Sequence, residues 1–278
     1  MIASIESAKQ VLVAAYTLHG PVLRALEDAA RRGARVDVEL ERAPFDDAKR
    51  HLAVENGRIA AELRRAGADA RLEDPIHAKT ISVDGALFLD EKNWHEDDIV
   101  LRADDAASIP MTKREALDQE ARLLYHARSS DGVVVESESF GAGNVTYSAL
   151  KALGLAGAAP RLLVSERDLR GSSRERATLE LLVRDGVRVR ICKDSAKLAV
   201  AGNRAWLGSA NATFADGKWA MPDWGLCTDD AEIARTVRQR LESEWAGARE
   251  FKSPTKSADR AAPDRVADPT RRTADPSE

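Results

Sequence analysis

A histidine and a lysine two residues apart, His77 and Lys79, form the pair in this chain whose types and spacing best suit chemistry. Alternate side chains of a strand project to the same face, so the two side chains would point together. Imidazole is a nucleophile or base near neutral pH, and lysine carries a compact positive charge. The pair therefore predicts a nucleophile or base beside a fixed cation.

Most of this pattern occurs a second time, 118 residues later in the chain. In both copies Ala precedes Lys, a short apolar alternation follows, and Asn stands 14 residues after the Lys, which gives Lys79 with Asn93 and Lys197 with Asn211. Ser195 occupies the position that corresponds to His77. The recurrence predicts a duplicated half-site.

Short strands must position the first copy. Asp84-Gly85 is typical of the tight turn of a hairpin between strands 80–83 and 86–89. Such a hairpin would return Asn93 toward the start of the motif.

The segments upstream of the two copies share one layout of strands and helices. Apolar runs predict strands, and helical periodicity that ends at glycine predicts helices. In the first half these are strand 11–16, helix 22–32, strand 34–40 and helix 59–66; in the second they are strand 133–140, helix 147–155, strand 161–164 and helix 177–185. Strands that alternate with helices favour an α/β fold with mixed sheets.

The length of 278 residues predicts two domains, and 44% apolar with 32% charged residues is ordinary for a globular protein. We expect a first lobe over 1–103 and a connector with a second lobe over 104–251, in which a helix covers 113–127. The stretch 252–278 is rich in proline and charge and is expected to be a disordered tail.

Other features exclude several classes of protein. No signal sequence or membrane span is recognisable, so a cytoplasmic location is expected, without stable membrane insertion. Cys192 and Cys227 do not have metal-ligand spacing, and buried thiols are expected. A net charge of -4 argues against a strongly basic nucleic-acid surface.

The two copies resemble the signature of the phospholipase D superfamily, which reads His-x-Lys, then Asp, then Gly-Ser-x-Asn, and which occurs twice in one chain. The first copy, 77–93, matches at His77, Lys79, Asp84 and Asn93 but has Asp90 and Glu91 in place of Gly and Ser. The second copy, 195–211, matches at Lys197, Gly208, Ser209 and Asn211 but has Ser195 for His and Gly202 for Asp.

The resemblance implies two α/β/α sandwich lobes, related by internal pseudo-two-fold duplication, whose motifs face each other across one shared site. It implies a phosphohistidine at His77 and a catalytic role for Asp84, without metal or cofactor. Lys79 and Lys197, with Asn93 and Asn211, would hold the phosphoryl oxygens. Ser195, Ser209 and Glu136 would line the substrate site, and by resemblance Glu136 would orient an active-site histidine.

The second histidine of the family acts as general acid, and Ser195 cannot do so. Three alternatives follow: the leaving group is already good, water serves, or a carboxylic acid stands in. The carboxylic-acid candidates are Glu136, Glu138 and Glu91.

Two functional hypotheses remain. One is a metal-independent phosphodiesterase that hydrolyses a phospholipid head group, a nucleic acid or a small diester through His77. The other is a degenerate relative that binds a phosphate-bearing ligand without turnover, and a scaffold without any ligand is a weaker third. The sequence does not decide between lipid, nucleic acid and small diester, or the oligomeric state.

Overall fold

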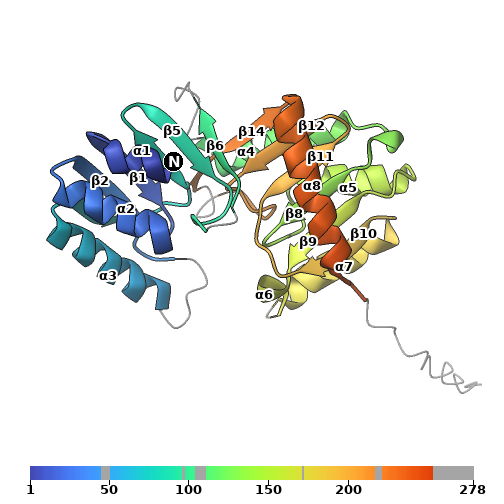
Figure 1. The fold of residues 1–278 in the computed structure, drawn as a ribbon. Helices are drawn as coiled ribbons and strands as arrows, with labels where there is room; N and C mark the ends of the chain where they lie inside the picture. Colours follow the sequence, from blue (N-terminus) through green and yellow to red (C-terminus); the bar gives the residue numbers. More distant parts are fainter. Residues whose placement is uncertain (45–50, 96–97, 104–110, 171, 217–220, 253–278) are drawn as a thin grey trace, which may run out of the picture.

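Two lobes, each built on one mixed β-sheet, lie side by side in the computed structural model, which describes residues 1–44, 51–95, 98–103, 111–170, 172–216 and 221–252 (Figure 1). The expected lobe boundary falls at the edge of 104–110, and the expected tail, 252–278, falls on 253–278 in all but its first residue. The segments 104–110 and 253–278 lie outside the described residues. None of the described helices is both long and apolar enough to cross a membrane.

The first lobe alternates strands with helices and then ends in a meander. Its elements are α1 (Ile2–Ser7), β1 (Gln10–Ala15), α2 (Gly20–Arg31), β2 (Arg35–Glu41), α3 (His51–Ala66), β3 (Asp69–Glu73), β4 (Thr80–Val83), β5 (Ala86–Asp90) and β6 (Val100–Ala103). The strand order is β3-β2-β1-β4-β5-β6, in which β1 pairs parallel with β2 and antiparallel with β4.

The second lobe repeats this plan and adds to it. Its elements are β7 (Met111–Thr112), α4 (Lys113–Tyr125), the short 3-10 turn Ser129–Asp131, β8 (Val134–Ser137), α5 (Val145–Leu155), β9 (Arg161–Ser165), α6 (Glu166–Leu169), α7 (Ser173–Arg184), β10 (Arg188–Cys192), β11 (Leu198–Ala201), β12 (Arg204–Gly208), β13 (Pro222–Asp223), β14 (Gly225–Thr228), α8 (Ala231–Gly247) and β15 (Arg249–Glu250). Its sheet order is β14-β12-β11-β8-β9-β10-β15.

Read from β10 to β14, the second sheet has the same order as the first read from β3 to β6. The registers agree as well, because β1 pairs Val13 with Ile81 and β8 pairs Val135 with Ala199, again 118 residues apart in the motif strand. The expected duplicated α/β architecture is therefore the observed one.

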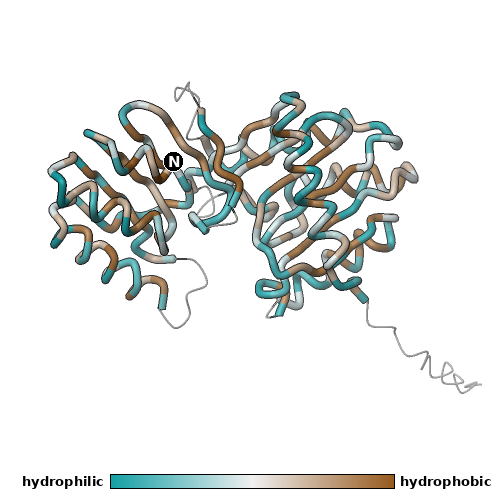
Figure 2. The backbone as a smooth tube through the Cα atoms, viewed as in Figure 1, coloured by the Kyte–Doolittle hydropathy of each residue, from teal (hydrophilic) through white to brown (hydrophobic). Residues whose placement is uncertain are grey.

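The two sheets differ in how their faces are covered. The first sheet alternates buried and less buried residues, as in β2, and its buried face packs on α1, α2 and α3. Its other face carries charged pairs such as Arg71 with Glu39. In the second lobe β8 and β11 are buried at every position, because α4, α5 and α7 cover one face and α8 the other. Figure 2 shows the apolar strands enclosed by more polar helices.

The lobes share a hydrophobic core at their junction. Leu87 and Leu89, which alternate on β5 of the first lobe, pack with Leu198, Leu207 and Trp224 of the second. The indole Nε1 of Trp224 also donates to the backbone oxygen of Asp90, at 3.1 Å. These contacts fix the two lobes against each other and set the geometry of the motifs between them.

Candidate functional site

His77 and Lys79 lie immediately before β4, beside the end of β1. His77 is 8% exposed and Lys79 1%. The Lys79 Nζ donates to the backbone oxygen of His77 at 2.7 Å and lies 3.4 Å from both ring nitrogens. Tyr16, which follows β1, meets the imidazole edge-on with ring centroids 5.4 Å apart, and its own ring centroid lies 5.4 Å from Lys79 Nζ. The predicted pair is thus held rigidly at the end of the strand.

The second lobe supplies the partner of the imidazole. Asp223, which is completely buried on β13, has its Oδ1 2.7 Å from His77 Nδ1. Ser209 Oγ donates to the same oxygen at 2.7 Å, and the Trp224 amide donates to Ser209 Oγ at 3.0 Å. A carboxylate acceptor favours the tautomer that is protonated on Nδ1. Nε2 of His77 is then the basic nitrogen available to an electrophile.

Lys197 stands in the second lobe where Lys79 stands in the first. Its Nζ, 1% exposed at the side chain, donates to the backbone oxygen of Ser195 at 2.7 Å and to Glu138 Oε2 at 2.9 Å. Burial works against ionisation of Glu138, but Lys197 outweighs it and lowers the pKa of that carboxyl to about 2. Glu138 is therefore an anion at neutral pH, so it cannot donate a proton to a leaving group.

Positive charge is concentrated around His77. Burial, and next the nearby Lys197, lower the pKa of Lys79 to about 7. Burial and then Lys79 lower the pKa of His77, against the opposing effect of Asp223. A third buried lysine, Lys113 at the start of α4, donates to Thr213 Oγ1 at 2.6 Å, and burial lowers its pKa. Such a site favours a neutral imidazole and attracts an anion.

Comparisons with known proteins address the fold of the whole chain. No protein-family model matches the sequence, and no curated protein does. Polyphosphate kinase from Porphyromonas gingivalis matches in structure with a TM-score of 0.58 at 15% identity, over 88% of this chain and 44% of that one. Phosphatidylserine synthase from Haemophilus influenzae Rd KW20 matches with a TM-score of 0.58 at 12% identity, over 90% of this chain and 84% of that one.

A smaller match is Nuc, a phospholipase D family member from Salmonella typhimurium, with a TM-score of 0.43 at 17% identity over 48% of this chain and 88% of Nuc. This chain spans less than half the length of the polyphosphate kinase. The two larger matches are both two-lobed folds of the phospholipase D superfamily. The chain has the phospholipase D-like fold. The resemblance that the motifs indicated is confirmed at the level of the fold.

Within this phospholipase D-like fold, three residues named from the motifs come together across the lobes. Lys197 lies close enough to His77 and Lys79 to lower the pKa of both groups. Asn211 lies beside the same region, with its Oδ1 3.4 Å from the amide nitrogen of Ser139. Asn93 is half-buried, and its Oδ1 accepts no hydrogen bond from a described residue.

The structure places Asp84 and Glu136 apart from this cluster. Asp84 is exposed in the β4–β5 turn with a φ of 47°, where its carboxylate accepts from the amides of Lys9 and Gln10. That is a turn-stabilising role at the end of β4 away from His77. Glu136 points to the α8 side of the sheet, where Oε1 accepts from the Ala196 amide at 3.3 Å, and burial raises its pKa to about 8.

Sequence reasoning missed Asp223 and the contact made by Tyr16. The sequence signal for Asp223 was its position beside Trp224 in an otherwise apolar segment. Burial of a carboxylate there is unfavourable unless it is paired. The ring of Tyr16 contacts both members of the motif pair, and no part of the motif marks it. Neither contact produces a recognisable pattern in the sequence, because each joins segments that are distant along the chain.

The matching registers also identify the residue of the first lobe that corresponds to Asp223 of the second. Gly208 pairs with Gly225 and Asp90 with Val100, so Asp98 occupies the position in the first lobe that Asp223 occupies in the second. The carboxylate of Asp98 on the first lobe would therefore face Ser195 on the second lobe, as Asp223 faces His77.

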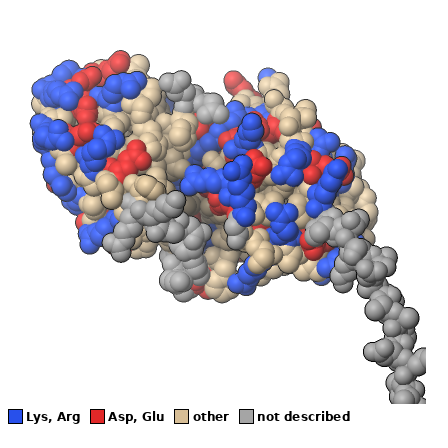
Figure 3. Space-filling view, turned by 90° about the horizontal axis from the view of Figure 1, so that it is seen from below, with Lys and Arg blue, Asp and Glu red and all other residues tan. Residues whose placement is uncertain are grey.

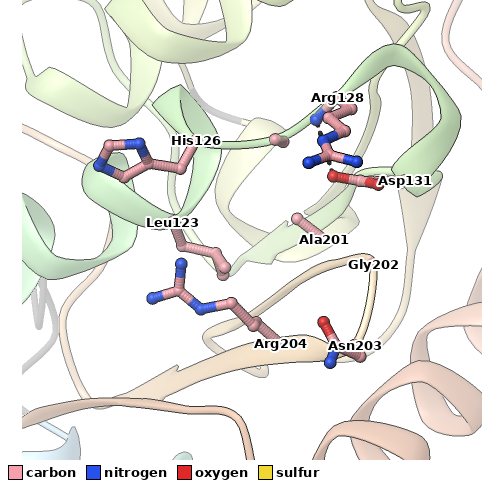
Figure 4. Close-up of a pocket in the computed structure, with 9 residues that line it drawn as sticks. Leu123, His126, Arg128, Asp131, Ala201, Gly202, Asn203 and Arg204 are labelled. Carbon is pink, nitrogen blue, oxygen red and sulfur yellow. Dashed lines mark hydrogen bonds between the residues drawn. The ribbon is translucent and has the colours of Figure 1, made fainter.

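A separate pocket of about 310 Å³ lies at the opposite end of β11 from Lys197 (Figure 4). It is lined by the end of α4 and the β11–β12 turn, including His126, Arg128, Asn203 and Arg204. Arg128 and Asp131 are already bonded to each other through the Arg128 amide, at 2.7 Å. This pocket is no part of the motif site.

Proposed function

We propose that this protein is a phosphodiesterase of the phospholipase D type, with His77 as its nucleophile. The observation that carries the proposal is the 2.7 Å contact between His77 Nδ1 and the buried Asp223, which leaves Nε2 as the nucleophilic atom. Asp223 here does what a carboxylate does for a catalytic imidazole: it fixes the tautomer and stabilises the cation that forms.

In the first step Nε2 attacks phosphorus and the ester P–O bond to the leaving group breaks, so that a phosphohistidine forms. Lys79 and Lys197 neutralise the non-bridging oxygens, where transition-state charge is spread. In the second step water attacks the phosphohistidine, the P–N bond breaks, and a phosphate monoester and free His77 result. The chemistry at His77 needs no metal ion.

The missing second histidine restricts the leaving group. Glu138 is ionised at neutral pH because of Lys197, which argues against this carboxyl as general acid. Glu136 bonds the Ala196 amide on the α8 side of the sheet. Glu91, the third candidate, is buried beside Asp90 and Asp98 on the first lobe. Of the three alternatives, a good leaving group or protonation by water is therefore favoured, and diesters with acidic leaving groups are the expected substrates.

The substrate is an anion, which agrees with the positive charge of the site. Figure 3 shows Lys and Arg side chains on the second lobe close to where the two lobes meet. Phospholipids and nucleic acids both contain phosphodiester linkages, and both fit this chemistry.

The experiment is hydrolysis of bis-p-nitrophenyl phosphate by the full chain in EDTA. Release of p-nitrophenolate is expected from the wild type and is expected to vanish in His77→Ala. His126→Ala, which alters an exposed histidine at the end of α4, is the matched control and should keep the activity. Activity that survives in His77→Ala contradicts the mechanism.

A second candidate is a protein that binds a phosphate-bearing ligand without turnover. Ser195 in place of the second histidine favours it, because the phosphohistidine would lack its usual general acid and base. It predicts no release of p-nitrophenolate but binding of inorganic phosphate or tungstate by calorimetry, weakened in Lys79→Ala and Lys197→Ala. Absence of any oxyanion binding would leave only a scaffold.

A further inference from the structure

Three carboxyl groups gather between the end of β5 and the start of β6: Asp90, Glu91 and Asp98. One oxygen from each lies within 4.8 Å of one from each of the others. Asp90 is completely buried, Glu91 is 1% exposed, and the side chain of Asp98 is completely buried. Buried carboxylates are costly unless they are paired, hydrogen-bonded or bound to a metal.

The hydrogen-bonding capacity of this cluster is mostly unused. Neither carboxylate oxygen of Glu91 accepts a hydrogen bond of ordinary geometry from a described residue, although the Ile99 amide lies near enough to favour its charged form. Asp90 Oδ2 accepts from the amides of Lys92 and Trp94, but Asp90 Oδ1 has no hydrogen bond from the described part of the chain. The carboxylate of Glu91 is thus buried with neither oxygen hydrogen-bonded to a described residue, which indicates a ligand that is not a protein group.

The nearby basic groups are bound chiefly to another acid. Lys92 Nζ lies 2.8 Å from Asp194 Oδ1 and 3.4 Å from Asp98 Oδ1, and Arg240 lies 2.6 Å from Asp194 Oδ2. Arg240 also lies 3.8 Å from Glu244 Oε1, so both cations are engaged by acids other than Asp90 and Glu91. When they are ionised, the carboxylates of Asp90, Glu91 and Asp98 form a concentration of negative charge that a divalent cation would offset.

We propose that Asp90, Glu91 and Asp98 bind a hard divalent cation such as Ca²⁺, Mg²⁺ or Mn²⁺. Carboxylate oxygens are the ligands that these ions prefer. The ion joins β5 to β6 beside the lobe junction, where Trp224 of the second lobe bonds the backbone oxygen of Asp90. The ion lies on the first lobe, on the side that would face Ser195, and takes no part in the attack by His77, so it is a stabilising site.

The test is calorimetric titration of the EDTA-stripped, dialysed full chain with CaCl₂, MgCl₂ and MnCl₂, together with thermal denaturation. At least one ion is expected to bind at one per chain and to raise the melting temperature by roughly 5 °C at a hundred-fold excess over its dissociation constant. No binding and no shift with all three ions overturns the proposal.

Glu91→Gln removes one ligand charge while conserving shape and is expected to weaken binding at least tenfold. Glu244→Gln is the matched control, since Glu244 on α8 belongs to the same acidic region through Arg240 but not to the ligand set. The melting temperature of each variant without metal shows whether it is folded. Binding that is unchanged in both Glu91→Gln and Asp98→Asn places the ion elsewhere and contradicts the assignment. Because the readout is metal binding, it stands or fails independently of hydrolysis at His77.

Discussion

Asp223 on β13 of the second lobe holds the imidazole of His77, which precedes β4 of the first lobe, through a 2.7 Å contact between Oδ1 and Nδ1. The two residues are separated by 146 positions in the sequence. One lobe thus provides the proposed nucleophile and the other its orientation, which makes the site dependent on the docking of the lobes.

Replacing Asp223 by Asn should lower kcat/KM for the aryl diester about 100-fold or more, with a much smaller change in KM. An amide can donate to Nδ1 and so favours the wrong tautomer of His77, the effect expected when the carboxylate of a triad is neutralised. Steady-state kinetics would measure it, with Asp229→Asn as the control at an exposed aspartate. A loss confined to KM would mean that Asp223 acts on binding instead.

The pH profile of kcat/KM should be bell-shaped with its maximum on the acid side of pH 7. Burial lowers the pKa of His77, so the imidazole is still neutral below its usual pKa and activity persists on the acid side. Burial and Lys197 lower the pKa of Lys79 to about 7, so Lys79 loses its positive charge, and its hold on the phosphoryl oxygens, as pH rises through this value. In Lys79→Arg the alkaline limb should move up by a unit or more, because arginine stays charged. An unmoved limb in a folded variant would assign it to another group.

Glu138→Gln should strengthen binding of inorganic phosphate. The carboxylate of Glu138 pairs with Lys197 at 2.9 Å and partly neutralises the cation that would face the anion. The glutamine variant leaves Lys197 with its full charge, and a severalfold lower dissociation constant is expected by calorimetry. Glu166→Gln, on the short helix α6, is a control that should bind phosphate as the wild type does. Weaker binding in Glu138→Gln would show that the pair is needed to position Lys197.

A buried carboxyl outside the site predicts how stability depends on pH. Burial raises the pKa of Glu120 on α4 to about 8, and its Oε2 accepts from Thr146 Oγ1 at 2.7 Å. Since the folded-state value is above the unfolded one, its contribution is complete below about pH 4.5 and is lost as pH rises to about 8. Glu120→Gln should therefore raise the free energy of unfolding at pH 9 and change it little at pH 4. Chemical denaturation at both pH values would measure this, and equal changes would contradict it.

The sequence predicted the fold well because its evidence is local and repeated. Strand 80–83, the Asp84-Gly85 turn and the alternation around it correspond to β4 and its hairpin. The recurrence at 118 residues corresponds to one strand order shared by both sheets, to which the second adds β15. Boundaries were less accurate: α3 begins at His51 rather than near Ile59, because Glu55-Asn56-Gly57 interrupts the apolar pattern within its first turns. Strand β8 ends at Ser137, where the expected strand continued to Phe140.

The candidate site was only half accessible to sequence reasoning. His77 and Lys79 are two residues apart immediately before β4 and could be paired by spacing, whereas Asp223 reaches His77 only through the packing of two lobes. Asp84 shows the opposite case, in which a residue that fits a signature lies in a turn and bonds backbone amides. The charge of Glu138 also depended on a partner, Lys197, whose position only the structure provides.

The last prediction tests whether the half-site without a histidine still faces the reacting phosphate. Asp98 matches Asp223 in sheet register, so in EDTA, where no cation occupies it, a carboxylate remains where it could orient an imidazole at position 195. Ser195→His should therefore speed hydrolysis of a diester with an alkyl leaving group, which needs a proton donor, by about tenfold or more. The aryl diester, whose leaving group is acidic, should gain little, and Ser195→Ala should gain nothing on either substrate. An equal response of the two diesters to Ser195→His would mean that the added imidazole does not reach the leaving oxygen.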